Sequence, residues 1–144
     1  MTQIPDWQTL LFVPVGADKH LASAIRNRPD AIILDLEDAI APEAKPEART
    51  RLADAQDQIA EAGIACVLRV NAGLRAMVSD LDAADHDRLA AVMVPKAETP
   101  RALQNAAELT SGAKGLIALI ETPAAVAALP SLAEVPQTVG LMLG

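Results

Sequence analysis

Six short apolar runs recur along the chain, and none of them alternates cleanly between apolar and polar residues. They read LLFVPV from Leu10, AIILDL from Ala31, IACVLRV from Ile64, AAVMVP from Ala90, GLIALI from Gly115 and VGLMLG from Val139. A strand with one face in water alternates, whereas the strands of a parallel sheet are covered on both faces and are apolar throughout. The runs therefore predict six parallel strands.

Alanine-rich stretches with helical character separate these runs. They span residues 18–27, 46–63, 80–90, 99–112 and 122–135. Two of them open on Thr-Pro, so we expect Thr99 and Thr122 to be N-caps, each followed by proline at the first helical position. Gly63 stands where a left-handed residue would end the second helix. The order is a strict strand-helix alternation, which defines an α/β fold.

The length of the chain leaves two α/β architectures open. A (β/α)8 TIM barrel typically needs about 250 residues, so 144 residues would cover about its first six βα units. A doubly wound sheet of five or six strands would fit the length better. Length thus favours the open sheet, whereas the polar residues discussed next favour the barrel. No linker is visible, so we treat residues 1–144 as one domain.

Composition and charge exclude several classes of function. The 12 basic residues face 19 acidic ones, which gives a net charge of −7 and argues against nucleic-acid binding. The N-terminal residues lack a signal-peptide pattern, and no apolar stretch approaches the roughly 18 residues of a membrane span. We expect a cytoplasmic protein with a small-molecule substrate. The single cysteine, Cys66, lies in an apolar run and is predicted to be a core residue.

Polar side chains follow most of the predicted strands, at the strand ends where α/β proteins bind ligands. They are Asp35, Glu37 and Asp38 after the second strand, Arg69 and Asn71 at the third, Lys96 and Glu98 after the fourth, and Glu121 after the fifth.

Asp35 and Glu37 are two residues apart and should point to one face, whereas Asp38 points to the other face or begins the loop. We interpret Asp35 and Glu37 as acceptors for metal-bound water or a cationic side chain; the alternative is helix capping. Arg69 lies among buried residues and needs a partner. It is expected to bind a substrate carboxylate, to pair with Asp35 or Glu37, or to do both.

Glu121 ends a very apolar run, where a lone carboxylate is costly to desolvate. Mg²⁺ is commonly held by one or two carboxylates, so we predict Glu121 as a Mg²⁺ ligand, against the alternative of an ordinary loop acid. Lys96 follows Pro95 directly. We favour an electrostatic role in substrate binding or a structural role for Lys96 over a Schiff base.

Five blocks of this sequence resemble the citrate lyase beta-subunit-like proteins of the HpcH/HpaI aldolase and citrate lyase family. The blocks are LLFVPVGADKHLASAI, DAIILDLEDAIAPEAKPEAR, VLRVNAG, VMVPKAET and LIALIETPAAV. The likeness covers nearly the whole chain. The order LDLED, KPEAR, RVN, PKAE and IET is a far more specific signature than any block alone.

The resemblance implies a TIM barrel that binds Mg²⁺ and breaks or forms a carbon-carbon bond beside a thioester carbonyl, in substrates such as malyl-, citramalyl- or citryl-CoA. It implies that Arg69 binds the keto acid, that Glu121 is one metal ligand, and that the catalytic acids Asp35 and Glu37 line the same mouth. The second metal ligand would be an aspartate shortly after the sixth strand. A homo-oligomer, commonly a trimer, is expected.

The sequence departs from the family at its C-terminal end. The family continues past GLMLG to the second metal ligand, so the C-terminal part is expected to be missing, and either a longer polypeptide or another chain would complete the barrel. Two alternatives stay open: a class II pyruvate-type aldolase, disfavoured because DLEDAI has no histidine, and a non-catalytic truncated barrel, or a receiver-like open sheet, that acts as a binding module.

Overall fold

The six predicted strands form one parallel sheet in which neighbours in space are also neighbours in sequence, in the order β1-β2-β3-β4-β5-β6. The computed structural model describes residues 6–110 and 114–144. Each strand begins at or next to the residue predicted for it. The strands are β1 (Leu10–Pro14), β2 (Ala31–Asp35), β3 (Ala65–Arg69), β4 (Ala91–Val94), β5 (Gly115–Ile120) and β6 (Thr138–Leu143).

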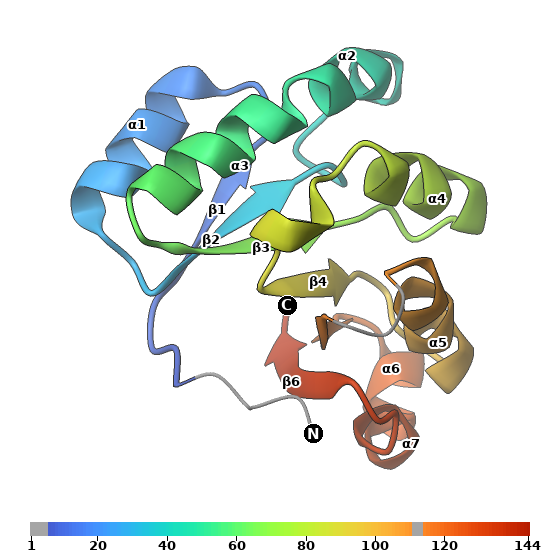
Figure 1. Ribbon diagram of the computed structural model, residues 1–144. Helices are drawn as coiled ribbons and strands as arrows, with labels where there is room; N and C mark the ends of the chain where they lie inside the picture. Colours follow the sequence, from blue (N-terminus) through green and yellow to red (C-terminus); the bar gives the residue numbers. More distant parts are fainter. Residues whose placement is uncertain (1–5, 111–113) are drawn as a thin grey trace.

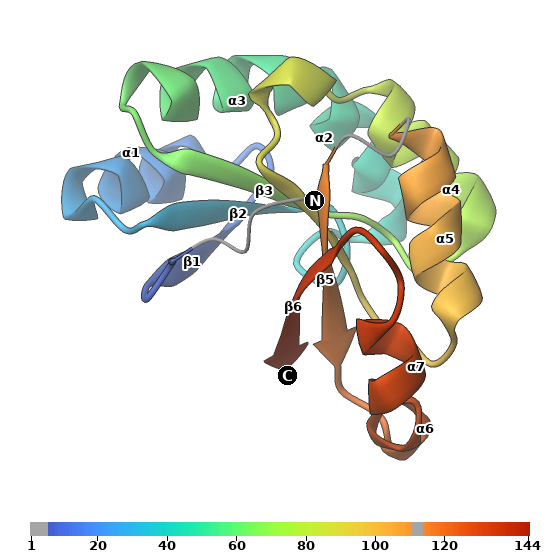
Figure 2. The same ribbon diagram turned by 60° about the horizontal axis from the view of Figure 1, so that its bottom comes forward.

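The strand order decides between the two architectures. Doubly wound sheets reverse their strand order at a switch point and carry helices on both faces. Here the order never reverses, and the helices lie along the outer side of a curved sheet (Figure 2). The doubly wound and receiver-like alternatives are therefore wrong. The arrangement is that of six consecutive strands of a TIM barrel with the helices that join them, as the resemblance implied.

The connecting helices follow the predicted stretches with several breaks (Figure 1). Their bounds are α1 (Asp18–Asn27), α2 (Lys45–Thr50), α3 (Leu52–Glu61), α4 (Leu74–Asp82), α5 (Pro100–Leu109), α6 (Pro123–Ala127) and α7 (Leu129–Ala133), with 3-10 turns η1 (Pro42–Ala44) and η2 (His86–Arg88). The single helix predicted over 46–63 is divided at Arg51, and that over 122–135 at Ala128. Residues 111 and 112 of the predicted fourth helix lie outside the described residues.

The helix predicted over 80–90 is wrong. The observed helix α4 ends at Asp82 and is followed by the separate turn η2. Asp85 cannot continue the helix, because the Gln56 side chain donates to its carbonyl oxygen and accepts from its N–H, both at 2.9 Å. Its carboxylate instead accepts from the Asp87 N–H at 3.0 Å, which caps η2. This bond pattern joins residues far apart in sequence and leaves no local signal.

Helix ends confirm part of the predicted capping. Gly63 has φ +68° and forms a Schellman motif, in which its N–H bonds the Ala60 carbonyl and the Ile64 N–H bonds the Ile59 carbonyl. Thr122 caps α6 by accepting from the Ala125 N–H at 3.1 Å. Thr99 occupies the N-cap position of α5, but its side chain makes no capping bond.

Two apolar clusters cover the two faces of the sheet, which explains the absence of alternation. The larger cluster lies between the sheet and the helices, and the smaller one lies on the inner face of the curve. The smaller cluster contains Ala31, Ile33, Val67, Ala91, Met93, Ile117, Leu119 and Val139. Cys66 lies in the larger cluster, as predicted, and burial raises the pKa of its thiol to about 12. Within the described ranges, none of the helices combines the length and hydropathy needed to cross a bilayer.

Candidate functional site

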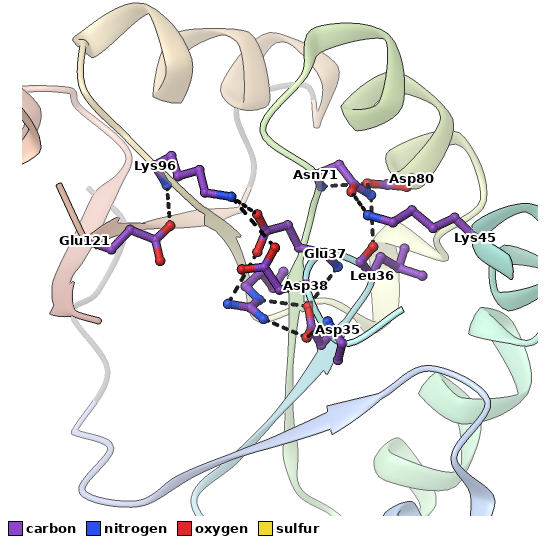
Figure 3. A network of polar contacts seen from close by, with 11 residues as sticks. Asp35, Leu36, Glu37, Asp38, Lys45, Asn71, Asp80, Lys96 and Glu121 are labelled. Carbon is purple, nitrogen blue, oxygen red and sulfur yellow. Dashed lines mark hydrogen bonds and ion pairs between the residues drawn. The ribbon is translucent and has the colours of Figure 1, made fainter. Parts of the chain in front are cut away.

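Side chains from four consecutive strand ends meet at the carboxyl edge of the sheet (Figure 3). Asp35 ends β2 and Arg69 ends β3, and the two are paired in the β2–β3 register. Lys96 follows β4, and Glu121 follows β5. Adjacent parallel strands end side by side, so residues separated by 34 positions in sequence, such as Asp35 and Arg69, come into direct contact.

Arg69 and Asp35 form a two-pronged ion pair. The Arg69 Nε and Nη2 atoms each lie 2.7 Å from one carboxylate oxygen of Asp35. The two side chains are only 12% and 2% exposed. Two parallel charge-assisted bonds of this kind fix both distance and orientation. The hydrogen bonds that Arg69 donates to Asp35 are the main reason that the pKa of Arg69 is raised above its ordinary value.

Every remaining acceptor position of Asp35 is directed at the loop that follows it. Its Oδ1 atom also accepts from the Glu37 N–H at 2.8 Å, and Oδ2 from the Ala39 N–H at 3.3 Å. With four donors on two oxygens, the carboxylate has its usual number of bonds. Asp35 thus holds both the arginine and the loop that carries Glu37.

The pairing leaves one edge of the Arg69 guanidinium available. Arginine has five N–H donors, and Asp35 takes the Nε–Nη2 edge. Nη1 and the second hydrogen of Nη2 form the remaining fork. The Phe12 ring, on β1, lies 4.9 Å from the Arg69 Cζ atom and supports the flat face of the guanidinium. Phe12 was not singled out from the sequence, because nothing local relates it to Arg69.

Glu37 lies between two cations. Its Oε1 atom accepts from the Lys96 ammonium at 2.7 Å, and its Oε2 atom lies 3.6 Å from Arg69 Nη1. Oε2 is buried and has no hydrogen-bond partner among the described residues. The neighbouring Asp38 is 66% exposed and reaches Lys96 only at 3.7 Å. Of these two neighbouring acids, Glu37 is therefore buried in the site, whereas Asp38 faces the solvent.

Lys96 joins the two glutamates of the site (Figure 3). Its side chain bonds Glu37, which is the main cause of the raised pKa of the Lys96 ammonium. Its backbone N–H donates to Glu121 Oε1 at 2.8 Å. Lys96 also has φ +50°, a left-handed conformation that is rare for a residue with a side chain.

The two Glu-Thr-Pro segments place their glutamates differently. Glu121 faces Lys96 and the end of β6, where a Cβ atom built on Gly144 would lie 3.4 Å from Glu121 Oε2. Glu98 instead accepts from the Thr122 hydroxyl at 2.8 Å and so links the two loops. Both glutamates lie in a loop between a strand and a helix, Glu98 after β4 and Glu121 after β5, but of the two only Glu121 contacts Lys96.

The donor atoms of the site suit a hard cation only in part. Glu121 offers a carboxylate oxygen, the ligand type that Mg²⁺ prefers. Asp35 is committed to Arg69 and to backbone N–H groups. Across residues 6–110 and 114–144, no three acidic, histidine or cysteine side chains converge to hold a metal. Glu121 therefore fits the role of one ligand in a site that needs further oxygen ligands.

A second buried network lies next to the site, and of its residues only Asn71 was singled out from the sequence. The fully buried Asp80 accepts from Arg49 and from both the backbone and the side-chain N–H groups of Asn71. Asn71 also donates to the Leu36 carbonyl at 3.0 Å and accepts from Lys45. Lys45 and Arg49 are four residues apart on α2, so their side chains lie on one face of the helix. This spacing is the feature of the sequence that indicates that both can reach the Asn71–Asp80 pair.

A profile of the HpcH/HpaI aldolase/citrate lyase family matches residues 8–144. The chain belongs to this family, and the strand order agrees with its barrel fold.

Among individual relatives, the chain is similar to the citrate lyase subunit beta-like protein of Mycobacterium tuberculosis, with 34% identity over 141 residues, 97% of this chain and 47% of the relative. It is also similar to the (3S)-malyl-CoA thioesterase of Cereibacter sphaeroides, with 28% identity over 144 residues, 99% of this chain and 50% of the relative. The crystal structure of CitE from M. tuberculosis in complex with magnesium, acetoacetate and coenzyme A gives a TM-score of 0.75 at 32% identity, covering 96% of this chain and 49% of that one. The chain thus spans about half the length of these relatives.

Proposed function

We propose that the protein to which this chain belongs is a Mg²⁺-dependent carbon-carbon lyase that acts on a β-hydroxyacyl-CoA thioester such as malyl-, citramalyl- or citryl-CoA. The observation that carries the proposal is the Nη1–Nη2 edge of Arg69, which makes no hydrogen bond of its own among the described residues while Asp35 and Phe12 hold the guanidinium in place. Glu121 lies at the same edge of the sheet. The relatives named for magnesium, coenzyme A and malyl-CoA support the choice of metal and substrate class. Residues 1–144 would form the first part of one barrel domain in a homo-oligomer.

Arg69 is the residue that we propose binds the keto-acid carboxylate. Its Nη1–Nη2 edge matches a carboxylate with two bonds, and its Nε–Nη2 edge is already held by Asp35. Asp35 is then a positioning residue. The Phe12 ring restricts rotation of the guanidinium, so the fork is oriented before a substrate binds.

Glu37 is the residue that we propose accepts the proton of the substrate hydroxyl. Cleavage needs that proton removed, so that the oxygen forms a carbonyl while the carbon-carbon bond breaks and its electron pair passes to the thioester enolate. A hydroxyl beside Arg69 Nη1 would supply the donor that Glu37 Oε2 lacks. Lys96 holds the other oxygen of Glu37 and keeps the carboxylate directed at the arginine.

Glu121 is the residue of this chain that we propose holds the metal, together with an aspartate supplied after β6. Gly144 pairs with β5 through a 2.9 Å bond to the Ile120 carbonyl, so the backbone after β6 emerges next to Glu121. When bound, Mg²⁺ supplies Lewis-acid polarisation of a substrate oxygen.

The test is Mg²⁺ binding and lyase activity of the complete protein. We expect Glu121→Gln to abolish Mg²⁺ binding in calorimetry, because the amide removes the anionic ligand, while Glu98→Gln in the matching segment leaves Mg²⁺ affinity unchanged. Arg69→Lys should lower kcat/KM about 10- to 150-fold, the equivalent of about 1.5–3 kcal/mol for a charged hydrogen bond. Equal Mg²⁺ affinity of Glu121→Gln and the unsubstituted protein would refute the metal assignment. Absence of carbon-carbon bond cleavage with every thioester substrate would favour the binding-module alternative.

A further inference from the structure

We propose that the left-handed backbone at Lys96 is a positioning device for the Glu121 carboxylate, separate from the role of the Lys96 ammonium. The proposal rests on the proposed function, because it assigns a purpose to the metal ligand. Among the described residues, only Arg28 and Lys96 are non-glycine residues with positive φ. Such a conformation costs free energy and persists where the surrounding structure demands it.

The reason for the strain lies in the backbone bonds at the end of β4. Pro95 has no N–H to donate, and the next amide that reaches the backbone of β5 is that of Ala97, 3.5 Å from the Leu119 carbonyl. Ala97 is fully buried, so the chain must return to the sheet at that point. The N–H of Lys96 lies between these two residues and is turned to Glu121 Oε1.

The hydrogen bond from the Lys96 N–H to Glu121 is suited to orient a carboxylate that binds a metal. An N–H to carboxylate bond is shorter and stronger than a neutral one, and a backbone donor has no rotamers to lose. It engages Oε1 of Glu121 at 2.8 Å and leaves Oε2, on the side of Gly144, for a cation. The Lys96 ammonium is directed elsewhere, at Glu37. Backbone and side chain of one residue thus hold the two glutamates.

A matched pair of substitutions separates the two roles. Lys96→Gly and Lys96→Val both remove the ammonium, but glycine adopts positive φ freely and a β-branched residue does so rarely. We expect the glycine variant to bind Mg²⁺ at least about fivefold more tightly than the valine variant in calorimetry of the complete protein, as the cost of a left-handed residue implies. Lys96→Ala should lie between them, and it replaces the valine variant if that protein does not fold.

The control is the same pair at Arg28, which has φ +49° at the C-terminal end of α1, before β2 begins. Arg28→Gly and Arg28→Val should differ in stability in the same direction, but their Mg²⁺ affinities should agree within about twofold. A Mg²⁺ difference of equal size in both pairs would show a general loss of stability and would overturn the proposal. Equal affinities of Lys96→Gly and Lys96→Val would overturn it too.

A metal-free readout keeps this inference distinct from the proposed function. In the ¹H–¹⁵N spectrum of the metal-free protein, the amide proton of residue 96 should be shifted downfield by the Glu121 carboxylate. That shift should persist in Lys96→Gly and be lost in Lys96→Val and in Glu121→Ala. A spectrum in which Glu121→Ala leaves the residue 96 amide unmoved would refute the contact. Failure of the unsubstituted protein to bind Mg²⁺ would instead refute the proposed function.

Discussion

Replacing Asp80 with alanine tests whether the buried network next to the site holds the fold together. Asp80 is fully buried on α4. One of its oxygens accepts a hydrogen bond from Arg49 Nε at 2.8 Å and lies 2.8 Å from Arg49 Nη2 in an ion pair. The other accepts from the backbone and side-chain N–H groups of Asn71, at 2.7 and 2.8 Å. The substitution removes three hydrogen bonds and leaves the Arg49 charge without its partner.

The expected loss follows from the burial of both partners. Removing one member of a buried ion pair typically costs about 3–5 kcal/mol, because the other charge stays buried and uncompensated. Arg49 is 18% exposed, so water can reach it in part, and we expect the lower end, about 3 kcal/mol. A domain has only about 5–15 kcal/mol of stability in total. The variant should therefore be markedly destabilised, although still folded in the absence of denaturant.

The assay is urea unfolding, followed by far-ultraviolet circular dichroism and by the fluorescence of Trp7, which packs against the inner cluster. With a slope of about 2 kcal/mol per molar urea, a loss of about 3 kcal/mol lowers the midpoint by about 1.5 M. The control is Asp57→Ala, which breaks a surface pair with Arg88 whose members are 54% and 44% exposed. Such a pair contributes about 0–1 kcal/mol.

Equal urea midpoints for Asp80→Ala and Asp57→Ala would refute the reasoning. They would mean that burial of the carboxylate does not increase its contribution to the free energy of unfolding. Asp80→Asn provides the second variant should the alanine protein fail to fold. It keeps the shape and one oxygen acceptor but loses the charge, so its midpoint should lie between those of the unsubstituted protein and Asp80→Ala.

Two further predictions concern parts of the fold outside the site. Hydrogen bonds from the Thr9 side chain and from the Gln8 and Thr9 N–H groups lower the pKa of Asp30. The ionised Asp30 carboxylate therefore stabilises the fold above its ordinary pKa of about 4, and this stabilisation is lost as the pH falls through the lowered pKa of the folded state. Asp30→Asn should therefore be less stable at pH 7 in urea unfolding, and the gap should narrow as the pH falls below about 4; a gap that is constant with pH would contradict this. Gly63→Ala should cost about 1 kcal/mol in the same assay, because φ is +68° and no atom crowds the new Cβ. Gly73→Ala, where φ is −71° and the space is equally open, should cost nothing, and equal losses at both glycines would contradict the backbone explanation.

The strands were predictable because a strand that is buried on both faces has a continuous apolar run in its sequence. The polar residues that end them were predictable for the same reason, since a charge next to such a run marks its end. Glu121 and Arg69 could be singled out in this way. Helix ends were predictable where they depend on local chemistry, as at Gly63 and Thr122. The helix predicted over 80–90 failed because Gln56, a distant residue, holds Asp85.

The pairing of the polar residues depended on the tertiary structure alone. Arg69 had two candidate partners in the sequence, and only the β2–β3 register placed Asp35 opposite it. The N–H of Lys96, which has a left-handed backbone, donates to Glu121, 25 positions away. Periodicity and capping are local, so the sequence by itself determined the elements and the residues at their ends. Which of those residues meet depends on the order and register of the strands, and only the folded sheet decided that.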